Sequence, residues 1–187
     1  MLREVEAAYC DMLGERHPRT LTARNNLANA LFDSRSSVDA EEIYRTVLAT
    51  QLEALGPSHP ETLTTCQNLA AALSSGGSHE AARQVLSDVI AEYENMFKPD
   101  HPSLLRARYM LAAVQERQGY LDGALHSYVD VLHLQTAALG TAHPDTLSTR
   151  LSVSNVLLKL RYSSESRAEY ERAILLAARA TFPPVRR

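Results

Sequence analysis

The sequence has little cysteine, lysine and glycine, no tryptophan, and no long apolar run. Its two cysteines, Cys10 and Cys66, are too few for a disulfide framework, and their wide separation fits no metal or redox motif. No stretch of about 18 consecutive apolar residues is present, so we expect no transmembrane helix. The acidic first residues also lack the apolar core of a signal peptide. These features predict a cytoplasmic protein that needs no cofactor.

The charges argue against two further classes of partner. Lys and Arg together number 19, Asp and Glu 22, and the formal net charge is −3. Both signs are interspersed along the chain, and the only lysines are Lys98 and Lys159. Because nucleic acids and anionic membranes are bound through concentrated positive charge, we expect neither to be a partner.

What the sequence does contain is a repeated His-Pro step. The step occurs four times, at intervals of 42 residues, with no insertion or deletion between copies: His17-Pro18, His59-Pro60, His101-Pro102 and His143-Pro144. A fixed period of this length is typical of stacked repeats, in which each unit buries its apolar face against the next.

Each copy reads as a pair of helices. Proline fits the first position of a helix, and the residue before proline disfavours helical geometry, so each histidine should lie just outside a helix start. Apolar residues at helical spacing follow, such as Leu69 and Leu73, and flexible residues such as Gly77 then end the helix. The second helix carries a small residue four positions before a bulky one, as in Ala82 and Leu86, which lets two helices approach closely.

This pattern divides the chain into repeats and predicts an all-α solenoid of antiparallel helix pairs. The first residues, 1–13, match the second half of a repeat, so they are either the end of a longer array or a lone helix that caps the first repeat. The predicted division is an orphan helix at 1–13, repeats at 14–55, 56–97, 98–139 and 140–181, and a tail at 182–187.

The repeat resembles the tetratricopeptide repeat in the 42-residue form found in kinesin light chains. The residues that carry the resemblance are Leu55-Gly56-Pro57-Ser58-His59-Pro60-Glu61-Thr62, Gln67-Asn68-Leu69-Ala70 and Asn25-Asn26-Leu27-Ala28. Similar arrays are attached to nucleotide-binding signalling NTPases. The resemblance covers residues 14–181, and it implies a right-handed superhelix whose first helices line a concave groove for an extended partner peptide. The chain has no heptad segment of the kind that holds a motor chain, and Met110 and Ser152 replace the asparagine found at 26 and 68.

No set of residues predicts catalysis. The four His-Pro histidines lie on different repeats, and packed helices are about 8–10 Å apart, so one zinc ion cannot be coordinated by several of them. Cys66 has no base at local spacing and reads as a small buried apolar residue. The turn at 75–78 lacks the lysine and the preceding strand of a phosphate-binding loop. We therefore expect a protein that is not an enzyme and holds no metal.

The candidate binding residues lie beside the Leu-Ala pairs of the first helices and one turn later. Amide side chains there suit the main chain of an extended peptide, and arginines would attract its acidic groups. Solvated side chains with no ligand are the alternative for each position. The predicted groove residues are Asn25, Asn26, Asn29, Gln67, Asn68, Arg106, Tyr109, Arg117, Asn155 and Lys159.

The function predicted from the sequence is a non-catalytic, adaptor-like scaffold that binds an extended, acidic peptide of a partner protein. Two alternatives remain open at this point. The chain could be a regulatory or recruiting segment of a larger NTPase or signalling enzyme, or a structural solenoid that associates with itself end to end; otherwise a monomer is expected.

Overall fold

The computed structural model describes residues 1–160 and Arg172, and it divides into two compact units, unit 1 (Met1–Glu92) and unit 2 (Tyr93–Arg187). Within the described residues every regular element is an α-helix, as predicted, and none of these helices is long and apolar enough to cross a membrane. The helices are α1 (Leu2–Leu13), α2 (Pro18–Asp33), α3 (Ser37–Ala54), α4 (Pro60–Ser75), α5 (His79–Met96), α6 (Pro102–Arg117), α7 (Leu121–Leu139) and α8 (Pro144–Lys159).

The four His-Pro steps start α2, α4, α6 and α8, which confirms the prediction. Each histidine is extended in its backbone and also caps its helix. In His17, His59, His101 and His143 the ring Nδ1 accepts a hydrogen bond from the backbone N–H two residues later, at 3.2–3.3 Å. A side-chain acceptor at this position satisfies one of the unpaired N–H groups of the first turn. The histidines are therefore structural, and no group of three or more potential metal ligands occurs among the described residues.

The turns that end α2, α4 and α6 share one backbone geometry but not one residue type. In each, an N–H beyond the turn bonds back to a carbonyl in the last turn of the helix, for example from Ser36 to Leu31 at 2.9 Å and from Ser78 to Leu73 at 2.8 Å. The residue before that N–H has a positive φ: 88° at Gly77, 85° at Gly119, but 66° at Arg35. Glycine adopts this left-handed conformation freely, whereas a side chain makes it costly.

Replacing Arg35 with glycine should therefore stabilise the protein. We expect a gain of about 0.5–1 kcal/mol in the free energy of unfolding, because the left-handed penalty exceeds the extra entropy that glycine loses on folding. The matched change is Gly77→Ala, where an added Cβ would meet no atom within 4 Å, so only the backbone cost remains, and stability should fall by a similar amount. Urea titrations of both variants test this, and a destabilised Arg35→Gly protein would contradict it.

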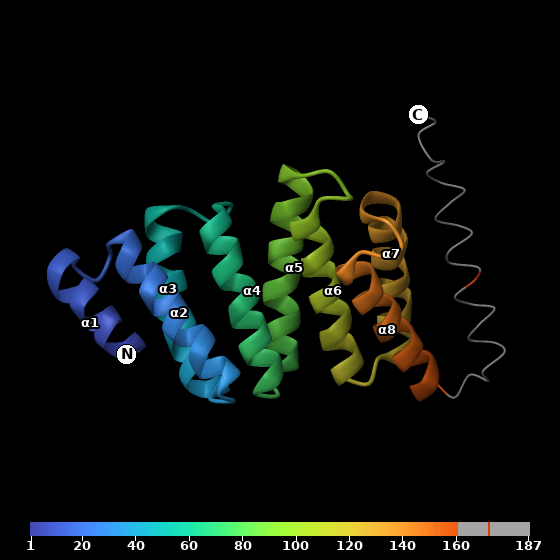
Figure 1. Ribbon diagram of the computed structural model, residues 1–187, viewed down its shortest axis with the longest axis horizontal. Coiled ribbons are helices and arrows are strands. Elements are labelled where there is room, and N and C mark those ends of the chain that lie inside the picture. Colours follow the sequence, from blue (N-terminus) through green and yellow to red (C-terminus); the bar gives the residue numbers. More distant parts are fainter. Residues whose placement is uncertain (161–171, 173–187) are drawn as a thin grey trace. The chain divides into compact units, whose positions relative to one another are not determined.

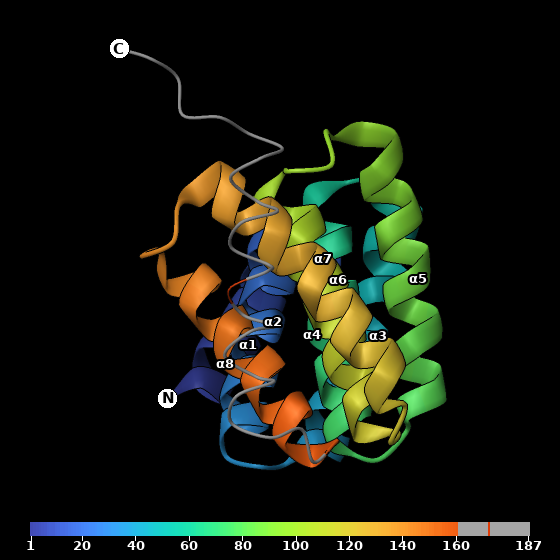
Figure 2. The same ribbon diagram turned by 90° about the vertical axis from the view of Figure 1, so that its right-hand side faces the viewer.

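In unit 1, consecutive helices pack against each other as in a tetratricopeptide solenoid. The first helices α2 and α4 contact one another, and α3 packs across both (Figure 1; Figure 2). The predicted pairing of a small residue with a bulky one four positions later is found in the core of unit 1. Ala40 and Tyr44 of α3 are both almost completely buried. α1 packs on α2, where the Arg24 Nε donates to the Glu6 carboxylate at 2.7 Å and this hydrogen bond raises the pKa of the arginine.

In unit 2 the core lies between α6, α7 and α8. Its fully buried members are mainly aliphatic and include the predicted pair Ala124 and Tyr128: Ala112, Ala124, Leu125, Tyr128, Leu132, Val153, Val156 and Leu157. The predicted second helix of the fourth repeat and the tail at 182–187 lie outside the described residues, apart from Arg172. The division into four repeats and an orphan helix stays a prediction.

Candidate functional site

The first helices of unit 1 are linked to each other through the amides predicted to line a groove. Asn25 of α2 donates from its Nδ2 to the Thr65 hydroxyl of α4 at 3.0 Å. Asn68 of α4 donates to the Oδ1 of Asn29 in α2 at 3.3 Å, and the same Oδ1 accepts from the Tyr44 hydroxyl at 2.5 Å. Three predicted groove residues thus form a ladder between helices, which fixes their amide groups in place.

The remaining unit 1 candidates differ in exposure. Asn26 is exposed on α2. Gln67 occupies the same repeat position as Asn25, but it is only 4% exposed, and its Nε2 has no hydrogen-bond partner among the described residues. The side chain of Gln67 is therefore packed into the protein and does not line an open surface.

In unit 2, α6 and α8 are joined by two side-chain contacts. The hydroxyls of Tyr109 and Ser152 are hydrogen-bonded at 3.0 Å, and the Lys159 Nζ donates to Glu116 at 2.7 Å. The same Glu116 carboxylate accepts from the Tyr128 hydroxyl at 3.0 Å. Burial, followed by the charge of Glu116, raises the pKa of Tyr128 well above its usual range. Lys159 is therefore engaged in an ion pair and not simply extended into solvent.

Besides Lys159, the exposed candidates in unit 2 are Arg106, Arg117 and Asn155. Arg117 already interacts with another group of the protein. Arg106 has no hydrogen bond or ion pair with any described residue, so its guanidinium group is available to a ligand.

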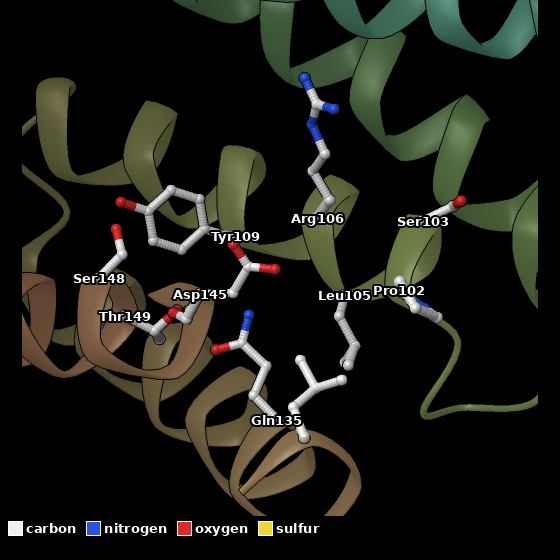
Figure 3. Close-up of a pocket in the computed structure, with 10 residues that line it drawn as sticks. Pro102, Ser103, Leu105, Arg106, Tyr109, Gln135, Asp145, Ser148 and Thr149 are labelled. Carbon is white, nitrogen blue, oxygen red and sulfur yellow. The ribbon is translucent and has the colours of Figure 1, made fainter. Parts of the chain in front are cut away.

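Arg106 borders a pocket of about 330 Å³ formed by α6, α7 and α8 (Figure 3). We call it the unit 2 pocket. Its size is at the lower end of the range for ligand-binding pockets. The lining mixes polar groups with a few apolar ones: Pro102, Ser103, Leu105, Arg106, Tyr109, Gln135, Leu139, Asp145, Ser148 and Thr149.

Two of the predicted groove residues, Arg106 and Tyr109, line this pocket, whereas Gln135, Asp145 and Ser148 line it without having been predicted as site residues. A signal for the glutamine was present: Gln51 and Gln135 stand at the same repeat position of a second helix, where apolar residues would serve packing equally well. Both are at least 95% buried, and in both the side-chain Oε1 has no hydrogen-bond partner among the described residues.

Unit 1 has a second pocket, of about 340 Å³, between α1 and α2. It lies at the corresponding place in the repeat, because Tyr9, Arg19 and Thr22 are three repeat lengths before Gln135, Asp145 and Ser148. Its chemistry differs, since an arginine replaces the aspartate and Leu2 and Val5 of α1 add apolar surface.

Cys66 lies outside both pockets. Cys66 is partly buried, and burial raises the pKa of its thiol to about 11, so it is almost entirely protonated near neutral pH. Cys66 is therefore interpreted as a small packed side chain, as the sequence predicted.

Comparison with known proteins agrees with the repeat pattern. The family model of the tetratricopeptide repeat matches residues 19–95. Comparison with curated protein sequences gives no match. A protein from Podosopora anserina described as a kinesin light chain with nearly identical TPR-like repeats is similar in structure, with a TM-score of 0.72, 24% identity, and coverage of 96% of this chain and 82% of that one.

Two further solved structures are similar. A variant of the same Podosopora anserina protein has a TM-score of 0.76 at 24% identity, covering 96% of this chain and 84% of that one. BtubC (BKLC) from P. vanneervenii has a TM-score of 0.74 at 17% identity, covering 100% of this chain and 78% of that one.

The described residues thus have an all-α fold of the tetratricopeptide type, and the family model identifies tetratricopeptide repeats at residues 19–95. The fold is the kinesin light chain-like form of that repeat, as the resemblance predicted. Repeats of this class generally mediate protein–protein interaction and are typically non-catalytic scaffolds.

Proposed function

We propose that this protein is a non-catalytic cytoplasmic scaffold that binds an extended, acidic segment of a partner protein along its first helices. The observation that carries the proposal is Arg106, an exposed arginine with no described partner, at the edge of a pocket formed by α6, α7 and α8. A guanidinium group binds carboxylates strongly and directionally, and an extended peptide also offers its main-chain groups to polar side chains.

The amide ladder of unit 1 supports a narrower role for the asparagines than the family resemblance implies. Asn25, Asn29 and Asn68 already bond between α2 and α4, so a ligand must either bond to their remaining polar atoms or displace these contacts. Asn68 keeps an amide oxygen that can accept a hydrogen bond from a peptide N–H.

Replacing Asn68 and Arg106 together, as Asn68→Ala with Arg106→Gln, should abolish capture of the bound partner from cell extract. Each change removes a group that the proposed ligand contacts, and neither fills or empties the core. Circular dichroism should show an unchanged helical signal, and cross-linking followed by mass spectrometry should map the partner segment to the first helices.

The matched control is Arg45→Gln, which removes one positive charge from an exposed side chain of the second helix α3. Capture should be unchanged in this variant. If the double variant captures the partner as well as the unaltered protein does, the assigned surface is wrong.

A further inference from the structure

We propose that the unit 2 pocket is a subsite for one acidic residue of the partner, with the carboxylate of that residue at Arg106 and a main-chain N–H of the same segment at the Oε1 of Gln135. The inference deepens the proposed function and rests on it. It also moves the main recognition site away from the asparagines of unit 1.

The first support is Gln135 itself. Its side chain lines the pocket although it is only 5% exposed, and its Oε1 has no hydrogen-bond partner among the described residues. A buried amide oxygen without a donor is unfavourable, and native structures leave few such atoms. A ligand that brings an N–H into the pocket removes this deficit.

The second support is the polarity of the pocket. Donors lie on α6, where the exposed guanidinium of Arg106 has no described partner. Acceptors lie on the other two helices, where Gln135 of α7 and the Asp145 carboxylate of α8 line the same space (Figure 3). Asp145 is well exposed and repels an anion at its own end, so a bound carboxylate belongs at Arg106.

Tyr109 and Ser148 also line the pocket, and neither is hydrogen-bonded to Arg106 among the described contacts. The Ser152 hydroxyl donates to the Ser148 carbonyl at 3.3 Å, and the Tyr109 hydroxyl is bonded to that same Ser152. Leu105 and Leu139 add an apolar wall. A capped peptide unit with an acidic side chain matches this combination, because it carries an anion, N–H donors and a small apolar stem.

A small inorganic anion fits less well. It would bind Arg106 but would donate few hydrogen bonds to Gln135. It would also be repelled by the Asp145 carboxylate, with no hydrogen bond gained in return. The volume of about 330 Å³ also favours one or two peptide residues over a large ligand.

The repeat supplies an internal comparison. Gln51 occupies the position of Gln135 and is equally buried and unpartnered. At the position of Arg106, however, the corresponding first helix has Thr22, which carries no charge. The pairing of a buried glutamine with an exposed arginine therefore distinguishes α6 and α7 from α2 and α3, and Gln51 is a natural control site.

The test is a titration of the full chain with acetyl-aspartyl-glycinamide, followed by NMR. We expect shifts of the Gln135 side-chain amide and of backbone amides in the first turns of α6 and α8. The asparagine analogue, acetyl-asparaginyl-glycinamide, should bind at least about fivefold more weakly, because it has no charge for Arg106. Acetyl-glycyl-glycine with a free carboxyl terminus tests the other source of a carboxylate and should also bind weakly.

Arg106→Gln and Gln135→Met should each lower the affinity for the capped aspartyl peptide about tenfold, the usual range for a lost hydrogen bond that involves a charged or buried group. Gln51→Met and Arg45→Gln should change it less than twofold. Arg106 is exposed, so this variant remains informative even if Gln135→Met folds poorly. No shift at millimolar peptide, equal binding of the asparagine analogue or of the free carboxyl terminus, or insensitivity to both pocket variants would overturn the inference.

The two proposals can fail separately. If the capped peptide does not bind but the Asn68 and Arg106 double variant still loses its partner, the scaffold function stands and the subsite is wrong. If the peptide binds the pocket while partner capture is unaffected by the double variant, the subsite stands and the proposed scaffold surface is wrong.

Discussion

Replacing Tyr128 with alanine should lower the free energy of unfolding by about 3–5 kcal/mol, the usual cost of removing a large buried ring. Tyr128 is 1% exposed and lies in the core between α6, α7 and α8. Its ring also packs against Tyr109, with ring centres 5.3 Å apart. Because alanine leaves a cavity that three helices border, their packing cannot close over it without moving the backbone.

The matched variant Tyr128→Phe keeps the ring and removes only the hydroxyl. It should lower the free energy of unfolding by about 1–2 kcal/mol, because it removes the hydrogen bond that the hydroxyl donates to the Glu116 carboxylate. The Glu116 carboxylate keeps Lys159 as a partner, so it is not left unpaired. Repeat proteins can unfold in parts, so hydrogen exchange of the α7 amides is the sharper measurement alongside urea titration. If the two variants differ by less than about 1 kcal/mol, the ring does not carry the packing of unit 2.

Raising the pH from 10 to 12 should destabilise the protein by about 2 kcal/mol through Tyr44 alone. Burial, followed by the charge of Asp33, raises the pKa of this phenol to about 12 from its ordinary value near 10. The folded protein therefore keeps a proton that the unfolded chain releases above pH 10. The stabilising effect is complete below pH 10 and is lost as the pH rises through 12.

Tyr44→Phe removes the titrating group and should flatten the decline of stability between pH 10 and 12. At pH 7 the same variant loses only the hydrogen bond to Asn29, at a cost of about 1 kcal/mol. Urea titrations of both proteins at several pH values between 7 and 12 measure the difference. Parallel pH profiles would show that Tyr44 ionises equally well in the folded and unfolded states.

The sequence was sufficient for the features that depend on neighbouring residues. A proline after histidine predicts the start of a helix, and α4 begins at such a step. An alanine four residues before a tyrosine predicts that two helices pack closely, and Ala40 and Tyr44 are both buried in such a contact. The period of 42 then extends them along the described chain.

Features that depend on the meeting of separate helices were not predictable in this way. The asparagine pattern suggests a ligand surface, but only the packing of α4 on α2 shows that Asn25 finds its partner in Thr65. The burial of Gln67 and the orphaned oxygen of Gln135 likewise depend on the neighbours that the fold supplies. The left-handed backbone of Arg35 could not be predicted for another reason, since arginine gives no indication of a positive φ.

The histidine caps have a consequence for how such a chain can change in length. Each first helix begins with a capping ring two residues from the amide it satisfies, so the signal is wholly internal to one period. Excising or duplicating 42 codons in frame, wherever the cut falls, leaves every His-Pro junction with its own downstream amide. An array of this kind can be shortened or extended through unequal recombination without a single new start signal having to evolve.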